Sequence, residues 1–301
     1  MSLEPRVCVI GSANLDLVAR AERIPRPGET VLGYAYIEAP GGKGLNQAVA
    51  AARSGASVSF IAAVGADAAA ATLTGVAEAD GISTLAVKRV VGPTGRALIN
   101  VGDDGENSIV VIPGANGQLD AKHVRIHGPT VARAQIVLAQ LEVPIPAVIA
   151  AFEVARAVGA TTILNPAPAA ELPDELLTLV DILIPNEHEA ASMGGVDHLR
   201  RLGIHTVIVT EGPRGCRVFD HTGERRIASF TVDAIDTTGA GDSFCGALSA
   251  RLALGSTIDD GLVWAGAAGA LATTVVGAVP SIPRTESIAE LIRSQGRAPQ
   301  G

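Results

Sequence analysis

Short apolar segments alternate with helix-forming segments along most of this 301-residue chain, and this alternation constrains the fold more than any other feature. The apolar segments, each followed by a polar or glycine-containing turn, are 6–10, 58–64, 135–141, 161–164, 181–184 and 206–209. The helical patterns are 44–54, 68–79, 147–158, 173–179, 240–254, 258–274 and 284–294. Strands that alternate with helices form a mostly parallel sheet covered on both faces. We therefore predict an α/β fold, with ligands bound beyond the carboxyl ends of the strands.

Two regions break the alternation, because they look like strands without intervening helices. They are 29–37 and 95–112, the second with a turn at Asp103–Gly105. We expect them to form a small antiparallel lid over the edge of the main sheet, with a pair of surface hairpins as the alternative. The chain is then a single domain, residues 1–301, whose lid strands come from about 14–40 and 95–113.

A glycine-rich turn, DTTGAGD at 236–242, leads directly into a predicted helix. Small residues let successive backbone N–H groups converge at a helix N-terminus, and this arrangement binds anions. Asp242 lies in the same turn, where a carboxylate is able to accept a proton from an attacking hydroxyl. The spacing alone fits equally well with Asp242 as an acidic residue of the first helical turn.

Two further motifs place polar groups beside glycines. GGKGLNQ at 41–47 opens a helix but lacks the P-loop spacing, and Lys43 and Asn46 are able to donate hydrogen bonds to hydroxyls. Asn14 and Asp16, after the first strand, alternate onto one face, where an amide and a carboxylate suit a vicinal diol. Taken singly, both motifs also fit ordinary turns.

Composition excludes several classes of function. Hydrophobic residues make up 48% of the chain and the net charge is −8, so we expect a large buried core and no nucleic-acid partner. The longest apolar stretch, 265–279, is shorter than a membrane span needs, and no signal peptide is visible at the N-terminus. Cys8, Cys216 and Cys245 show no metal-type spacing. We expect a cytoplasmic protein.

Taken together, the motifs resemble the two signatures of the ribokinase-like (PfkB) carbohydrate kinases, Gly-Gly-Lys-Gly-x-Asn-Gln and Asp-Thr-x-Gly-Ala-Gly-Asp. The resemblance covers nearly the whole chain and is strongest to the ribokinase branch of that family. The collinear segments that carry it are PRPGETVLG at 25–33, GGKGLNQAVAAARSGA at 41–56, VIPGAN at 111–116, QLEVP at 140–144, NPAPA at 165–169 and PNEHEA at 185–190.

This resemblance implies a Rossmann-like sheet, a β-lid that also forms a homodimer contact, and ATP-dependent phosphorylation of D-ribose at O5. Asp242 would remove the proton from O5. The anion hole for the transferring phosphoryl group would be formed by Gly239, Ala240, Gly241 and Asp242. The sugar would be bound by Asn14, Asp16, Gly42, Lys43, Asn46 and Glu142.

The resemblance also implies where the nucleotide and the metal ions bind. Mg²⁺ would accompany ATP and be organised by Glu189, largely through water. K⁺ would lie beside the anion hole as a monovalent activator, near Asp236, Ser281 and the backbone carbonyl of Thr238. ATP would be bound by Asn186, Thr210, Gly212, Gly215, Gly241 and Gly277.

The sequence departs from the family pattern on the nucleotide side. The segment between Met193 and His198 is very short, Gly266 replaces a larger polar residue, and Val275–Val276 replaces an arginine-containing stretch. The alternatives keep the fold and change the sugar to deoxyribose, fructose or a nucleoside, or make the protein a non-catalytic regulator. A dinucleotide-dependent oxidoreductase is disfavoured because no G-x-G-x-x-G follows a strand.

Overall fold

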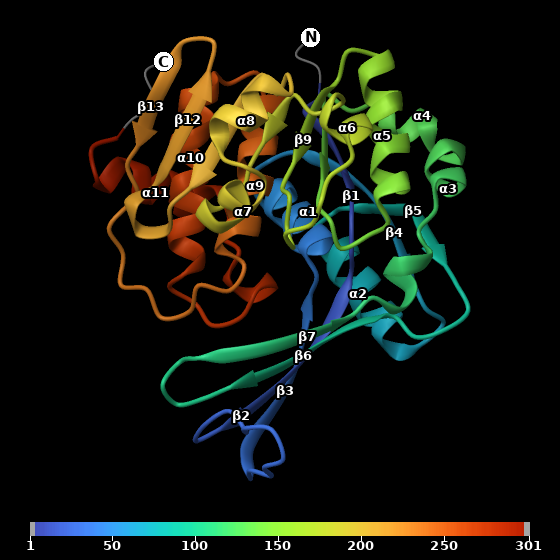
Figure 1. Ribbon diagram of the computed structural model, residues 1–301, viewed down its shortest axis with the longest axis vertical. Helices are drawn as coiled ribbons and strands as arrows, with labels where there is room; N and C mark the ends of the chain where they lie inside the picture. Colours follow the sequence, from blue (N-terminus) through green and yellow to red (C-terminus); the bar gives the residue numbers. More distant parts are fainter. Residues whose placement is uncertain (1–3, 298–301) are drawn as a thin grey trace.

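The computed structural model describes residues 4–297; the two ends of the predicted domain, residues 1–3 and 298–301, lie outside the described residues. A nine-stranded sheet forms the centre of the fold (Figure 1). Its order is β13-β12-β11-β10-β9-β8-β1-β4-β5, with the bounds β1 Arg6–Ile10, β4 Ser57–Val64, β5 Ser83–Arg89, β8 Ile136–Ala139, β9 Thr161–Leu164, β10 Ile182–Leu183, β11 Thr206–Thr210, β12 Cys216–Asp220 and β13 Gly223–Ile227. Strands β5 to β11 of this order pair in parallel, and β12 and β13 pair antiparallel. The predicted mostly parallel sheet is confirmed.

Helices cover both faces of this sheet, because successive side chains of a strand point to opposite faces. In β1, Val7 and Val9 belong to one buried cluster, and Cys8 and Ile10 belong to the other. The first cluster includes α1 Lys43–Arg53, α2 Ala68–Ala79, α9 Ala240–Ala253 and α10 Ile258–Ala272. The second includes α3 Ala121–Ile126, α4 Gly128–Val131, α5 Ile145–Ala157, α6 Asp174–Leu177, α7 Glu187–Ser192 and α8 Val196–Arg201. A third cluster packs α11 Thr285–Ser294 against α9 and α10.

A second, four-stranded sheet projects from one edge of this body (Figure 1). Its order is β3-β2-β6-β7, with the bounds β2 Asn14–Ala21, β3 Gly33–Gly41, β6 Gly95–Val101 and β7 Asn107–Ile112. The two outer pairs are antiparallel, but β2 and β6 pair in parallel, so the prediction of an antiparallel lid is wrong for the central pair. Only three residues separate β1 in the main sheet from β2 in the second sheet. The start of β2 therefore lies at the junction of the two sheets.

Three short 3₁₀ helices complete the described elements: η1 Gly114–Gln118, η2 Gly212–Arg214 and η3 Val279–Ser281. Between residues 4 and 297, no helix is both long enough and apolar enough to cross a lipid bilayer.

Candidate active site

Polar side chains gather where the second sheet meets the carboxyl ends of the main-sheet strands. Asn14 begins β2 just after β1, and Glu142, Asn165 and Asn186 follow β8, β9 and β10. Helices α1 and α9 begin at the same edge and pack against each other. Their approach is close at Gly246, where an added Cβ would lie 2.3 Å from the carbonyl oxygen of Gln47.

Glu142 connects three segments at this junction. Its Oε2 atom accepts hydrogen bonds from Ser12 Oγ at 2.5 Å and from the backbone N–H of Lys43 at 3.1 Å. The Nδ2 group of Asn14 lies 3.5 Å from the same oxygen. The glutamate thus links the end of β1, the start of β2 and the start of α1.

Asn14 is oriented by a second buried amide, Asn116 in η1. The Nδ2 group of Asn116 donates to Asn14 Oδ1 at 2.7 Å and to the carbonyl oxygen of Ala13 at 3.3 Å. Its Oδ1 accepts from the backbone N–H of Ala13 at 3.0 Å. Because Asn14 Oδ1 is occupied in this way, its Nδ2 group faces Glu142.

Two glycines leave the space that this arrangement needs. A Cβ at Gly41 would lie 2.1 Å from Asp16 Oδ2, and a Cβ at Gly95 would lie 2.2 Å from Asn14 Oδ1. Gly42, the residue before α1, has φ 91°, a left-handed conformation that favours glycine. The glycine pair of the GGKGLNQ motif is therefore explained by close packing at the junction.

Asp242, in the first turn of α9, is buried and directed toward α1. Its Oδ2 accepts from Asn46 Nδ2 at 2.9 Å, and its Oδ1 accepts from Gln47 Nε2, also at 2.9 Å. Gly239 is the N-cap residue, and no side chain caps this helix. Asp242 is therefore an acidic residue of the first helical turn, as the alternative held, but its carboxylate does not cap α9 and instead accepts hydrogen bonds from α1.

Three carboxyl groups and one ammonium group share this site. Burial, followed by the nearby charges of Glu142 and Asp242, raises the pKa of Asp16 to about 7. Asp242 raises the pKa of Lys43 against the opposing effect of burial, with further contributions from Glu142 and Glu189. The site thus combines a carboxyl that titrates near neutrality with a firmly charged ammonium group.

The turn before α9 presents free backbone donors. Gly239 has φ 76°, in the left-handed region. The N–H of Ala240 donates to the carbonyl oxygen of Thr237 at 3.2 Å, whereas no acceptor among residues 4–297 takes the N–H of Gly241 or Asp242. No atom lies within 4 Å of a Cβ added at Gly241. Two backbone donors and the positive end of the helix dipole therefore face open space, as an anion site requires.

Asp236 ties this turn to the loop before η3. Its Oδ1 accepts from the backbone N–H of Thr238 at 2.9 Å, and its Oδ2 accepts from the N–H of Gly277 at 2.8 Å. Burial works to raise the pKa of Asp236, but these hydrogen bonds outweigh it, and the pKa is lowered. The hydroxyl of Ser281 donates to the carbonyl oxygen of Ala278 at 2.7 Å. Asp236 and Ser281, both predicted for K⁺, thus bond to the adjacent residues Gly277 and Ala278.

Asn186 and Glu189 form a reciprocal capping box at the start of α7. Asn186 Oδ1 accepts from the backbone N–H of Glu189, and Glu189 Oε2 accepts from the N–H of Asn186, both at 2.8 Å. Burial raises the pKa of Glu189. This local role accounts for both residue types, and it leaves Glu189 Oε1 without a hydrogen-bond donor among the described residues.

The residues predicted for the nucleotide lie on the neighbouring segments. Thr210 ends β11 and forms an isolated bridge with Asn186, while Gly212 begins the 3₁₀ turn η2 and Gly215 follows it. Gly215 has φ 92°, and an added Cβ would lie 2.0 Å from the carbonyl oxygen of Ile227. Only three residues join α7 to α8, and a hollow of about 630 Å³ lies beside this short connection.

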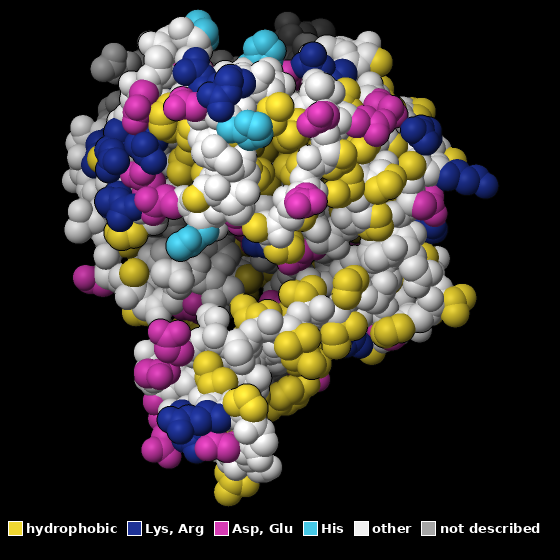
Figure 2. Space-filling model, viewed as in Figure 1, with side chains coloured by type: hydrophobic (Ala, Val, Ile, Leu, Met, Phe, Trp, Pro, Cys, Tyr) yellow, Lys and Arg dark blue, Asp and Glu magenta, His cyan; other side chains and the backbone are white. Residues whose placement is uncertain are grey.

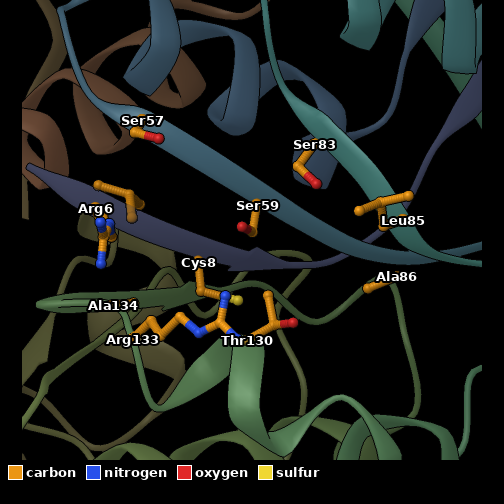
Figure 3. A pocket seen from close by; sticks show the side chains of 11 residues that line it. Arg6, Cys8, Ser57, Ser59, Ser83, Leu85, Ala86, Thr130, Arg133 and Ala134 are labelled. Atoms are coloured by element: carbon orange, nitrogen blue, oxygen red, sulfur yellow. The ribbon is translucent and has the colours of Figure 1, made fainter. Parts of the chain in front are cut away.

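A separate hollow of about 260 Å³ opens at the amino ends of β1, β4 and β5 (Figure 3). Arg6, Arg133 and the hydroxyl groups of Ser57, Ser59 and Ser83 line it, and no lining residue carries a carboxylate. It therefore offers no general base for proton abstraction. The residues predicted for catalysis lie at the opposite edge of the sheet.

Sequence reasoning missed four polar residues that the structure places in this network: Ser12, Gln47, Asn116 and Gln140. Gln47, Asn116 and Gln140 lie in segments that carry the family resemblance, and Ser12 lies two residues before Asn14. Their location near the predicted site residues was the signal that could have indicated a role. The hydrogen-bond partner of each side chain is distant in sequence, however, and cannot be predicted from local spacing.

Comparisons with known proteins identify the family of this chain. Residues 4–285 match the pfkB family carbohydrate kinases. The ribokinase of Haemophilus influenzae is 40% identical over 94% of this chain and 97% of its own length, and that of Staphylococcus aureus is 39% identical over 94% and 98%. The bifunctional ribokinase/ribose-5-phosphate isomerase A of Fructilactobacillus sanfranciscensis is 41% identical, and this chain spans 56% of its length.

Solved structures give the same result. Arabidopsis thaliana ribokinase complexed with ribose and ATP has a TM-score of 0.89 and 31% identity, over 97% of this chain and 99% of that chain. Thermotoga maritima ribokinase has a TM-score of 0.88 and 33% identity, over 95% and 99%. The ribokinase-like fold with its small second sheet is confirmed. The match of nearly the whole chain shows that this protein belongs to the pfkB family of carbohydrate kinases.

Proposed function

We propose that this protein transfers the γ-phosphoryl group of ATP to O5 of D-ribose, with Asp242 as the general base. One observation carries the proposal: the Asp242 carboxylate and the free N–H groups of Gly241 and Asp242 occupy the same helix terminus. A proton acceptor and an anion site side by side are what transfer of a phosphoryl group to a hydroxyl needs. The named relatives and the A. thaliana complex with ribose and ATP support the choice of substrates.

The sugar would lie between the junction of the two sheets and the start of α9. Asn14 Nδ2, the Lys43 ammonium and the carboxylates of Asp16 and Glu142 offer donors and acceptors for several hydroxyls. Asn46 Oδ1 is buried and has no hydrogen-bond partner among the described residues, so it is a ready acceptor for one more hydroxyl. Asp242 would take the proton of O5 as that oxygen attacks the phosphorus.

The protein's own contribution to transfer is positional and electrostatic. In-line transfer needs the two oxygens and the phosphorus held in one geometry, with donors directed at the charge on the phosphoryl oxygens. The N–H groups at the start of α9 and the Lys43 ammonium supply such donors. We propose the second sheet as the lid that excludes water from this reaction, because Asn14 begins β2 and is also a proposed sugar contact.

The implied metal ions fit the residues present. Mg²⁺ is usually bound by one or two carboxylates together with substrate phosphates, and Glu189 Oε1 is available to it through water. When bound, Mg²⁺ offsets the charge of the phosphates. For K⁺ we propose the oxygens around Asp236 and Ser281, next to the anion site.

We also propose that two copies of this chain pair through their second sheets. Large apolar side chains of this sheet are exposed, and hydrophobic side chains gather over it in Figure 2. Those at least 40% exposed are Tyr34, Tyr36, Ile37, Leu98, Ile109, Val110, Val111 and Ile112. An apolar patch of this kind marks an interaction site in a soluble protein.

For location we propose the cytoplasm, where ATP is available and three unpaired cysteines stay reduced.

The test of the substrate is a screen of ADP release with ribose, deoxyribose, fructose and nucleosides. We expect the highest kcat/KM with ribose, and a product that carries its phosphate on O5 by ³¹P NMR. Strong activity on another sugar with none on ribose would contradict the substrate, and ADP release independent of every sugar would contradict the kinase.

A further inference from the structure

We propose that Gln47, held in place by Gln140, is a positioning residue that fixes the base carboxylate of Asp242 against the sugar hydroxyl. The inference rests on the proposed function, because it assumes that Asp242 is the base. Gln47 lies on α1, next to the predicted sugar contact Asn46, and is not among the site residues that the sequence predicts. Its side chain is fully buried.

Both hydrogens of the Gln47 amide are used within the protein. Nε2 donates to Asp242 Oδ1 at 2.9 Å and to Asn165 Oδ1 at 3.1 Å. Asn165 is itself oriented, because its Nδ2 donates to the carbonyl oxygen of Ile184 at 2.9 Å. The amide of Gln47 therefore joins the base on α9 to the ends of β9 and β10.

The acceptor-only carboxylate of Asp242 sets the orientation of the Gln47 amide, and Gln140 supports this orientation from the other side. Gln140, fully buried after β8, donates from Nε2 to Gln47 Oε1 at 2.6 Å. A flipped Gln47 amide would turn its oxygen toward the acceptors of Asp242 and Asn165 and its NH₂ toward the NH₂ of Gln140. Every contact would then be repulsive, so only one orientation is compatible with the network.

Gln140 is confined in turn by the backbone of Gly11. A Cβ at Gly11 would lie 2.1 Å from Gln140 Oε1, so a side chain at position 11 would displace this amide. The network thus runs from the end of β1 through Gln140 and Gln47 to the base. A fixed base matters because a misplacement of about 1 Å costs ~10²-fold in rate.

Asn46 and Gln47 each donate a hydrogen bond to one carboxylate oxygen of Asp242, but they differ in their other contacts. Asn46 donates to Oδ2, but its own Oδ1 has no protein partner, so the residue is free to reorient toward a bound sugar. All polar atoms of Gln47 are bonded within the protein. Gln47 therefore holds the base whether or not the sugar is bound, and its loss should act on kcat and leave ribose binding unchanged.

The test is a double-mutant cycle with Gln47→Met and Gln140→Met, assayed by ribose-dependent ADP release. Methionine keeps the length of the side chain and removes its donors. We expect Gln47→Met to lower kcat ~10–100-fold, with the KM for ribose changed less than about threefold. Gln140→Met should lower kcat by a smaller factor, and the double variant should match Gln47→Met alone, because Gln140 acts through Gln47.

The matched control is Thr162→Val. Thr162 is fully buried near the amino end of β9, and its hydroxyl donates to the carbonyl oxygen of Leu179 at 2.5 Å. This control should lose thermal stability without a change in kcat. A Gln47→Met kcat within twofold of wild type would overturn the inference, and so would a double variant whose loss is the product of the two single losses.

Three further outcomes test this inference and separate it from the proposed function. If Gln47→Met does not fold, Gln140→Met is the deciding variant. We then expect it to have a lower kcat at constant KM, and an unchanged kcat would contradict the inference. If Asp242→Asn is inactive while Gln47→Met is normal, the base assignment stands and the positioning role falls. If Asp242→Asn keeps its kcat, both fall.

Discussion

Asp16 should make the stability of this protein depend on pH in a way that Asp16→Asn removes. Its carboxylate lies at the junction of the two sheets, and no described residue donates a hydrogen bond to it. Burial and the charges of Glu142 and Asp242 raise its pKa to about 7. The folded protein therefore holds Asp16 protonated under conditions in which the unfolded chain would ionise it.

The pH window follows from the two pKa values, about 7 in the folded protein and 3.8 as the ordinary value. Below pH 3.8 the carboxyl is protonated in both states, and its contribution to stability is fully present. As the pH rises to about 7, only the unfolded chain gains by ionisation, so this contribution is lost. A difference of about 3 pKa units corresponds to at most about 4 kcal/mol of unfolding free energy.

The assay is urea unfolding of wild type and Asp16→Asn from pH 4 to pH 8, without sugar. The unfolding free energy of Asp16→Asn, relative to that of wild type, should increase by about 2–4 kcal/mol between pH 4 and 7. Above pH 7 this difference should stay constant. The exposed Asp233→Asn is the matched control. A difference for Asp16→Asn that stays flat across this range would refute the reasoning.

Three further predictions concern the anion site, the K⁺ site and the second sheet. Gly241→Ala should keep its melting temperature, because its Cβ meets no atom, yet lose turnover ~10²-fold, because the methyl group enters the anion site; near-normal kcat would contradict the site. Ribose phosphorylation should be faster in K⁺ than in Na⁺ at equal ionic strength, and Asp236→Asn should remove the difference; equal rates in wild type would contradict the K⁺ site. Val110→Arg should convert a dimer into a monomer in sedimentation equilibrium, and a monomeric wild type would contradict pairing.

Local sequence pattern predicted the main sheet well where strand and helix carry clear periodicity. The bounds of β9 and α2 agree with the predicted 161–164 and 68–79. Strand β2 lies within the range 14–40 predicted for the lid, but periodicity did not locate it, because Asn14 and Asp16 are typical turn residues. Its pairing with Gly41 and Gly95 comes from distant segments. β12 and β13 were missed as well, because charged residues such as Arg217 and Arg225 interrupt their apolar pattern.

The sequence predicted which residues of the motifs belong to the site, but it did not predict the contacts between them. Asp242 was located by its turn, but the partners of its carboxylate, Asn46 and Gln47, lie almost 200 residues earlier in the chain. The contact between Asn116 and Asn14 spans 102 residues. Such pairs follow from the packing of α1 on α9 and of η1 on β2, which no local pattern encodes.

The central claim, that Asp242 is the base for phosphorylation of ribose, is tested most directly by Asp242→Asn. The amide keeps the size of the side chain and cannot accept the proton. We expect ribose and ATP to bind with affinities close to wild type by calorimetry, while kcat for ADP release falls at least ~10²–10⁴-fold. A variant that binds both ligands and keeps a kcat near wild type would contradict the account.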